Sequence, residues 1–125
     1  MSFASSKSPL SQGDQYPEAL LAQAVQQCAF GVTIADARRA DMPLVHSNRA
    51  FEKLSGYSTA ETYGRNCRFL QGPETDRHSV EMIRDTIRAE KAATVLILNY
   101  RKDGSRFWNR LQLSPLHDSK GRLEA

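Results

Sequence analysis

The feature that most constrains the fold is a stretch of alternating apolar and polar residues near the C-terminus, interrupted by one turn signal. In ATVLILNYRKDGSRFWNRLQLSPL, two strand-like runs flank Lys102-Asp103-Gly104, which predicts a β-hairpin. Successive side chains of a strand point to opposite faces of a sheet. Each strand therefore places an amide in an apolar row: Val95, Ile97 and Asn99 on the first, and Phe107, Asn109, Leu111 and Leu113 on the second.

Both asparagines point inward only if the turn has an odd number of residues. A three-residue loop with Gly104 in the left-handed conformation meets this condition, whereas a two-residue Asp-Gly turn puts the amides on opposite faces. Each amide alone can bond to backbone or water. Two inward amides on neighbouring strands favour a flat heterocycle whose edge alternates donors and acceptors.

The rest of the chain alternates short strands and helices, which predicts an α+β domain. Residues 1–16 are poor in aliphatic side chains and are expected to form a flexible tail, and residues 17–29 a cap helix. GVTIAD and LVHS are the next two strands. Asn48 and Gly56 delimit the helix RAFEKLS, Ser58 and Glu61 form a capping box for one more turn that Gly64 closes, and a longer helix runs from about residue 77 to residue 91.

Two arginines suggest an anion. Arg84 follows Val80 by one helical turn, on the stripe that Ile83 and Ile87 share. Such an arginine can extend to solvent or pair with a carboxylate. Arg68 is a second arginine available for binding. A phosphate held between the guanidinium groups of Arg68 and Arg84 is the alternative, because the guanidinium fork matches phosphate oxygens.

The stretch NCRFLQG, followed by NYRKDGSRFWN, resembles the light-oxygen-voltage (LOV) domains, the flavin-binding branch of the PAS fold. The resemblance covers nearly everything after Ala29, so residues 30–125 are expected to form a bacterial-type blue-light sensor domain. It implies a five-stranded antiparallel sheet with helices packed on one face around a flavin pocket. Without the resemblance, Cys67 would be interpreted as an inert buried thiol. Cys28 is expected to be a packing residue of the cap helix.

The resemblance implies a role for each motif residue. Cys67 would be the thiol that bonds C4a of flavin mononucleotide (FMN) reversibly under blue light. Asn99 and Asn109 would bond the pyrimidine edge of the ring, and Asn66 and Gln71 would contact the ribityl chain. Arg68 and Arg84 would hold the phosphate, and the ring cavity would be lined by Thr33, Val80, Leu111 and Leu113. Phe69 and Leu70 would pack beneath the turn, and Glu61 and Lys102 would form a surface ion pair.

One departure concerns the last strand of the family, which would follow DSKGRL and lie between GVTIAD and the second hairpin strand. The sequence stops at Ala125, where that strand would begin. We expect the domain to be incomplete at its C-terminus, or another strand to fill the gap, because unpaired sheet edges recruit strands.

The outer face of the sheet predicts a partner. It would carry Val32, Ile34, Leu96, Leu98, Tyr100 and Trp108, which is more apolar surface than a monomer usually exposes. The predicted cover is the cap helix, a second copy of the chain, or both, so we expect a homodimer through this face or the N-terminal helix. An effector domain outside this sequence is a further possible partner.

Composition narrows the remaining classes. The 17 Lys and Arg residues against 14 Asp and Glu residues do not form a basic stripe, so no nucleic-acid partner is expected. The sequence has no membrane span, no signal peptide and two distant cysteines, which favours the reducing cytoplasm. No metal cluster or catalytic constellation is present, so an enzyme is not expected. The alternatives are a light-independent flavin redox sensor and a cofactor-free PAS interaction module.

Overall fold

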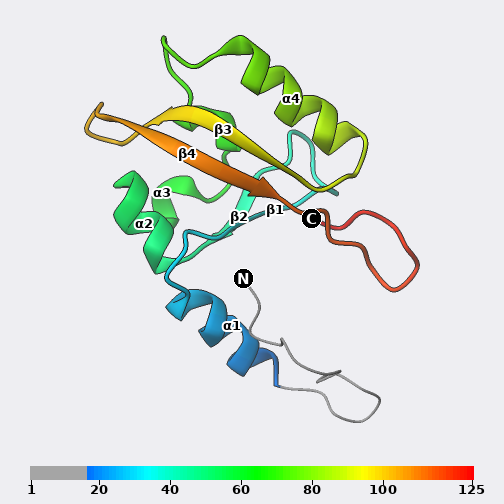
Figure 1. Cartoon of the computed structure of the whole chain (residues 1–125). Coiled ribbons are helices and arrows are strands. Elements are labelled where there is room, and N and C mark those ends of the chain that lie inside the picture. Colours follow the sequence, from blue (N-terminus) through cyan, green and yellow to red (C-terminus); the bar gives the residue numbers. More distant parts are fainter. Residues whose placement is uncertain (1–16) are drawn as a thin grey trace.

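The computed structural model describes residues 17–125, which form a mixed α+β domain (Figure 1). Helix α1 (Glu18–Gln27) precedes strands β1 (Thr33–Ala35) and β2 (Leu44–Ser47), and three short helical segments follow: α2 (Arg49–Ser55), α3 (Thr59–Thr62) and the 3-10 turn η1 (Cys67–Leu70). Helix α4 (Arg77–Arg88) leads into β3 (Ala93–Tyr100) and β4 (Arg106–Leu113). The predicted α+β class is confirmed, and the predicted tail over residues 1–16 lies outside the described residues.

The β3–β4 hairpin has the register that the alternation predicts. Ile97 pairs with Asn109 and Asn99 with Phe107, so the opposed residue numbers have an even sum. Arg101 N donates to Ser105 O at 2.7 Å, which leaves a three-residue loop, and Gly104 has φ 88°. The inward side chains of β3 are 2 to 4% exposed (Val95, Ile97 and Asn99), so this face of the hairpin is core.

Strands β1 and β2 form a second antiparallel hairpin, and within residues 17–125 no ladder joins it to β3 and β4. Thr33 pairs with Ser47 and Ile34 with His46, followed by a register shift at Ala35. Beyond β1, Ala37 N donates to Glu124 O at 3.0 Å, so the last described residues lie beside the end of β1. That a further strand fills the space between β1 and β4 stays a prediction.

The predicted helix caps of the central segment are confirmed. Asn48 Oδ1 accepts the first-turn amide of Phe51 at 3.0 Å, and Gly56 ends α2 with φ 81°. Ser58 and Glu61 form the reciprocal capping box of α3, and Gly64 follows with φ 84°. These caps satisfy amides at the starts of α2 and α3 within a few residues of sequence.

Helix α4 ends earlier than the sequence predicts. Its last helical residue is Arg88, not a residue near Lys91, because Glu90 adopts a left-handed φ of 53°. Lys91 N then donates to Thr86 O at 3.2 Å, a bond that closes the helix end in the way a C-terminal glycine usually does. Helix α4 lies along β3 (Figure 1), and Ser79 Oγ donates to Leu96 O at 3.3 Å. No helix among residues 17–125 is both long and apolar enough to cross a membrane.

Asn48 ties the N-terminal segment to the core. Its side chain is fully buried and makes four hydrogen bonds: Nδ2 donates to Val25 O (3.0 Å) and Phe30 O (2.8 Å), and Oδ1 accepts from Val32 N (2.8 Å) and Phe51 N (3.0 Å). One amide therefore satisfies backbone groups of α1, of the segment before β1 and of α2. Helix α1 itself has no buried residue, so this amide is a main link between α1 and the domain.

We predict that Asn48→Ala lowers the free energy of unfolding by about 2 to 4 kcal/mol, because it removes a helix cap and leaves buried backbone groups unpaired. Urea unfolding followed by circular dichroism measures the change. Ser58→Ala, which removes an exposed cap, is the matched control and should cost about 1 kcal/mol. Equal losses in the two variants would contradict the role given to Asn48.

Candidate functional site

The two inward asparagines lie side by side on the buried face of the hairpin. Asn109 Nδ2 donates to Asn99 Oδ1 at 3.0 Å. The Nδ2 group of Asn99 has only a long contact of 3.4 Å with Leu98 O, and Asn109 Oδ1 accepts no hydrogen bond from the described residues. The pair therefore keeps a donor and an acceptor for another molecule, in a wall that is otherwise apolar.

The two amides have apolar neighbours on their own strands. Ile97 and Phe107, which pair across from the two amides, are 2% and 8% exposed. The other predicted wall residues are half-buried: Thr33 on β1, Val80 on α4, and Leu111 and Leu113 on β4. Leu111 and Leu113 share the inward face with Asn109, as predicted. Such a surface suits a planar apolar ring with a polar edge.

Cys67 begins a single turn of 3-10 helix that its neighbours hold at both ends. Asn66 caps this turn, with Oδ1 accepting Arg68 N at 2.9 Å, and Gln71 N donates to Arg68 O at 2.9 Å. Leu70 is 4% exposed and packs the turn onto the core, as predicted. Burial raises the pKa of the Cys67 thiol, because a thiolate loses hydration in these surroundings. The thiol is therefore neutral near pH 7.

An aromatic and cationic cluster supports this turn, and only Phe69 of its members was predicted. Phe69 meets Tyr57 edge to face, with ring centroids 5.0 Å apart. The guanidinium carbon of Arg65 lies 4.2 Å from the Phe69 centroid and 5.9 Å from that of Tyr57. An arginine at a tight turn followed by an aromatic residue four positions later is the signal that could have found this cluster.

The segment after the turn is fixed on β3. Gly72 lies so close to Tyr100 that a Cβ atom would stand 2.3 Å from the ring. Tyr100 Oη accepts Glu74 N at 2.9 Å, and Thr75 Oγ1 donates to Leu98 O at 2.7 Å. Tyr100, which the sequence placed on the outer face, therefore anchors the segment that follows Gln71. Gln71 is half-buried at the end of the turn.

The two predicted phosphate ligands differ in their surroundings. Arg68 is exposed and makes a bidentate ion pair with Asp41, with Nη1–Oδ2 2.8 Å and Nη2–Oδ1 2.5 Å. Arg84 is exposed on α4 and has no ion pair within the described part of the chain. The sequence missed Asp41 as the partner of Arg68. Whether either arginine binds phosphate stays a prediction.

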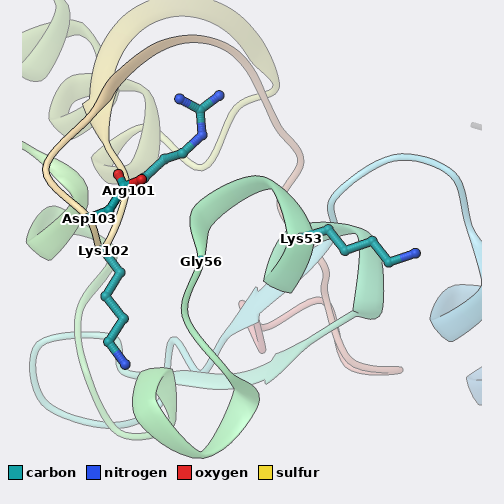
Figure 2. Close-up of a pocket in the computed structure, with 5 residues that line it drawn as sticks. All are labelled: Lys53, Gly56, Arg101, Lys102 and Asp103. Atoms are coloured by element: carbon teal, nitrogen blue, oxygen red, sulfur yellow. The ribbon is translucent and has the colours of Figure 1, made fainter.

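A separate hollow of about 540 Å³ lies between α2 and the β3–β4 loop, and Figure 2 shows its lining residues Lys53, Gly56, Arg101, Lys102 and Asp103. The Lys53 and Lys102 side chains point in different directions (Figure 2). Arg101 Nε donates to Leu54 O at 3.0 Å, and the guanidinium stacks on Phe107. The cations do not converge, so this hollow is a junction between elements rather than a binding site.

The predicted Glu61–Lys102 ion pair lies beside this hollow and is confirmed. The hydrogen bond from Lys102 lowers the pKa of Glu61 to about 2, and the backbone amide of Ser58 adds to the effect. Both partners are exposed, so the pair contributes to stability only weakly. Across residues 17–125, no group of His, Cys, Asp or Glu is arranged to hold a metal ion.

Comparison with known proteins identifies the family. A family model described as a PAS domain matches residues 30–125. The solved LOV domain of a blue-light-activated histidine kinase from Erythrobacter litoralis is 46% identical, with a TM-score of 0.73 over 78% of this chain and 91% of that one. This chain is a LOV domain of the PAS family. A second solved LOV domain, studied with a flavin analogue, is 44% identical, with a TM-score of 0.78 over 84% of this chain and 78% of that one.

Some relatives are longer than this chain, which matches only part of their length. A blue-light-activated histidine kinase from Rhizobium johnstonii is 46% identical over 104 residues, which are 83% of this chain and 30% of the kinase. The chain thus spans less than a third of the length of the kinases that it matches.

We predict that Cys67 of this LOV domain reacts with iodoacetamide in the dark only at higher pH than a free cysteine does. The raised pKa keeps the thiol protonated until the pH exceeds the ordinary value of roughly 8.5. Mass spectrometry of the Cys67 peptide across a pH series, with glutathione as the reference thiol, measures the midpoint. A Cys67 midpoint below that of glutathione would contradict the prediction.

Proposed function

We propose that this LOV domain binds FMN and senses blue light through Cys67. The observation that carries the proposal is the Asn99–Asn109 pair, which offers a free donor and a free acceptor on a buried, apolar wall. An isoalloxazine ring has the matching shape, because its faces are apolar and its pyrimidine edge alternates donors and acceptors. The blue-light-activated kinases and the flavin-analogue study among the relatives support the same assignment.

The remaining residues fit the other parts of FMN. Thr33, Val80, Leu111 and Leu113 would line the ring, and Asn66 and Gln71 would bond the ribityl hydroxyl groups. Arg68 and Arg84 would bind the phosphate, because guanidinium groups pair well with its oxygens. Phosphate binding by these arginines would favour FMN over riboflavin, which lacks the phosphate.

Cys67 supplies the chemistry that makes the sensor reversible. FMN bound here would supply the absorption of blue light and the electrophilic ring carbon C4a. Cys67 would supply both the nucleophilic sulfur and the thiol proton to the excited ring, so the reaction would need no other reactant. The 3-10 turn and its caps hold the sulfur in place, which makes the encounter intramolecular. In the dark, Cys67 would recover its proton and its free thiol, which would restore the starting state.

The proposed function is to produce a signal, not to convert a substrate. Cys67 and the flavin would both be regenerated and no substrate would be consumed, so we assign the domain as a sensor rather than an enzyme. Its partner would be an effector domain, as the kinase part is in the relative from Rhizobium johnstonii. The reducing cytoplasm fits this chemistry, because Cys67 must stay a free thiol in the dark.

We predict that illumination bleaches the blue absorption band of the purified protein and that the band recovers in darkness. Cys67→Ala should bind flavin but lose the slow recovery phase, whereas Cys28→Ala, which changes the other cysteine, should behave like the parent. Light-minus-dark absorption spectra measure both. Recovery in Cys67→Ala that matches the parent would favour a light-independent redox sensor, and a colourless protein from flavin-replete cells would favour a cofactor-free PAS module.

We further propose that the outer face of the β3–β4 hairpin forms a homodimer interface. Leu96 is 58% and Trp108 67% exposed on this face, and Leu98 pairs with Trp108 across the strands. A tryptophan that is two-thirds exposed beside two leucines is an apolar surface that a second copy would cover.

Trp108→Glu should therefore convert a dimer into a monomer, because it places a charge in the apolar contact. Size-exclusion chromatography with light scattering at high micromolar concentration measures the mass. Leu116→Glu, at a 53% exposed leucine beyond the end of β4, is the control and should leave the dimer intact. A parent protein that is monomeric under these conditions would contradict the proposal.

A further inference from the structure

Arg68 is held by a carboxylate that lies 27 positions earlier in the sequence. Both oxygens of Asp41 bond the two terminal nitrogens of the guanidinium, at 2.8 and 2.5 Å, and both side chains are 60% exposed. This is the end-on fork geometry in which a guanidinium also binds phosphate. The pair cancels the charge of one of the two arginines that the proposed function assigns to the phosphate.

The backbone holds Asp41 at this position. Asp41 and Met42 have left-handed φ values of 66° and 44°, and neither is glycine. Two such residues in succession are costly and persist only where surrounding contacts impose them. Asn66 Nδ2 donates to Asp41 O at 2.6 Å, so the backbone of Asp41 is bound to the residue before Cys67 while its side chain is bound to the residue after it. The contact is therefore built into the loop rather than made by a freely rotating surface side chain.

A phosphate at Arg68 must displace Asp41 or share the guanidinium with it. Nε and one N–H on each terminal nitrogen remain available, so sharing is geometrically possible. In either case two anions lie against one cation, and their repulsion opposes phosphate binding. Arg68 also lowers the pKa of Asp41, so the carboxylate is ionised near neutral pH.

We propose that Asp41 is a built-in competitor of the flavin phosphate at Arg68, which weakens the preference of the site for FMN over riboflavin. The inference rests on the proposed function, since it assumes that Arg68 faces the phosphate. The affinity of the site for phosphorylated flavin would then be lower than it would be without the competing carboxylate of Asp41. Asp41 acts here only through its ion pair with Arg68.

The test compares two flavins on two proteins. Flavin-free protein is titrated with FMN and with riboflavin, and the quenching of flavin fluorescence gives the two dissociation constants. Asp41→Asn should raise the FMN-to-riboflavin affinity ratio by about three- to tenfold at low ionic strength, because it removes both a repelling carboxylate and an exposed ion pair with which the phosphate competes. Asparagine tolerates the left-handed conformation, so the loop should keep its shape. In 1 M salt the difference should nearly vanish, because the Debye length falls to about 3 Å.

Two control variants separate charge from structure. Glu74→Gln removes another exposed carboxylate that pairs with an arginine, Arg106, and should leave the ratio unchanged. Asp41→Glu keeps the charge and should keep the parent ratio. A purely structural role of Asp41 would weaken both flavins alike and leave the ratio where it was.

The outcomes distinguish this inference from the proposed function. Binding of both flavins with an unchanged or lower ratio in Asp41→Asn overturns the role of Asp41 alone. Failure of the parent to bind either flavin overturns the proposed function and this inference with it. A raised ratio that disappears in high salt supports both.

Discussion

The pairing register of β3 and β4 is the constraint on which the candidate site depends. A slip of one residue between the strands would put Asn99 and Asn109 on opposite faces and bring outer-face residues of one strand into the core. The three-residue loop closed by Gly104 selects the observed register, and the buried Ile97 and Phe107 hold it. The same pairs that stabilise the sheet thus place two amides side by side. The hydrogen bonds between β3 and β4 therefore both stabilise the sheet and position the candidate site.

The turn that carries Cys67 is the second requirement, and it is held from both sides. Before the cysteine, Asn66 binds the Asp41 backbone, and after it Gly72 packs directly against Tyr100. A short 3-10 turn has too few internal hydrogen bonds to fix its own orientation. Contacts with the loop before β2 and with β3 therefore decide where the sulfur points. Burial keeps the thiol neutral, so the residue that we propose to react after light absorption is unreactive before it.

Buried and exposed polar interactions in this LOV domain are of different kinds. Uncharged amides lie where water is excluded, as at Asn48 and Asn99, because a buried amide can be satisfied by neighbours whereas a buried charge is costly. The ion pairs, among them Arg68–Asp41 and Lys102–Glu61, lie at the surface, where salt screens them. The proposed ring site is thus insensitive to ionic strength, and the proposed phosphate site is the part that ionic strength can tune.

The sequence by itself determined the features encoded within a few residues: the alternation of β3 and β4, the odd hairpin loop, and the caps at Asn48 and Ser58. The predicted end of α4 was wrong, because Glu90 adopts a left-handed conformation that glycine usually adopts. Only the tertiary structure decided which distant groups meet. Asp41 reaches Arg68 across 27 positions, and Tyr100 reaches the Glu74 amide across 26. No local pattern specifies such pairs, since they arise only when packing brings separate elements to one place.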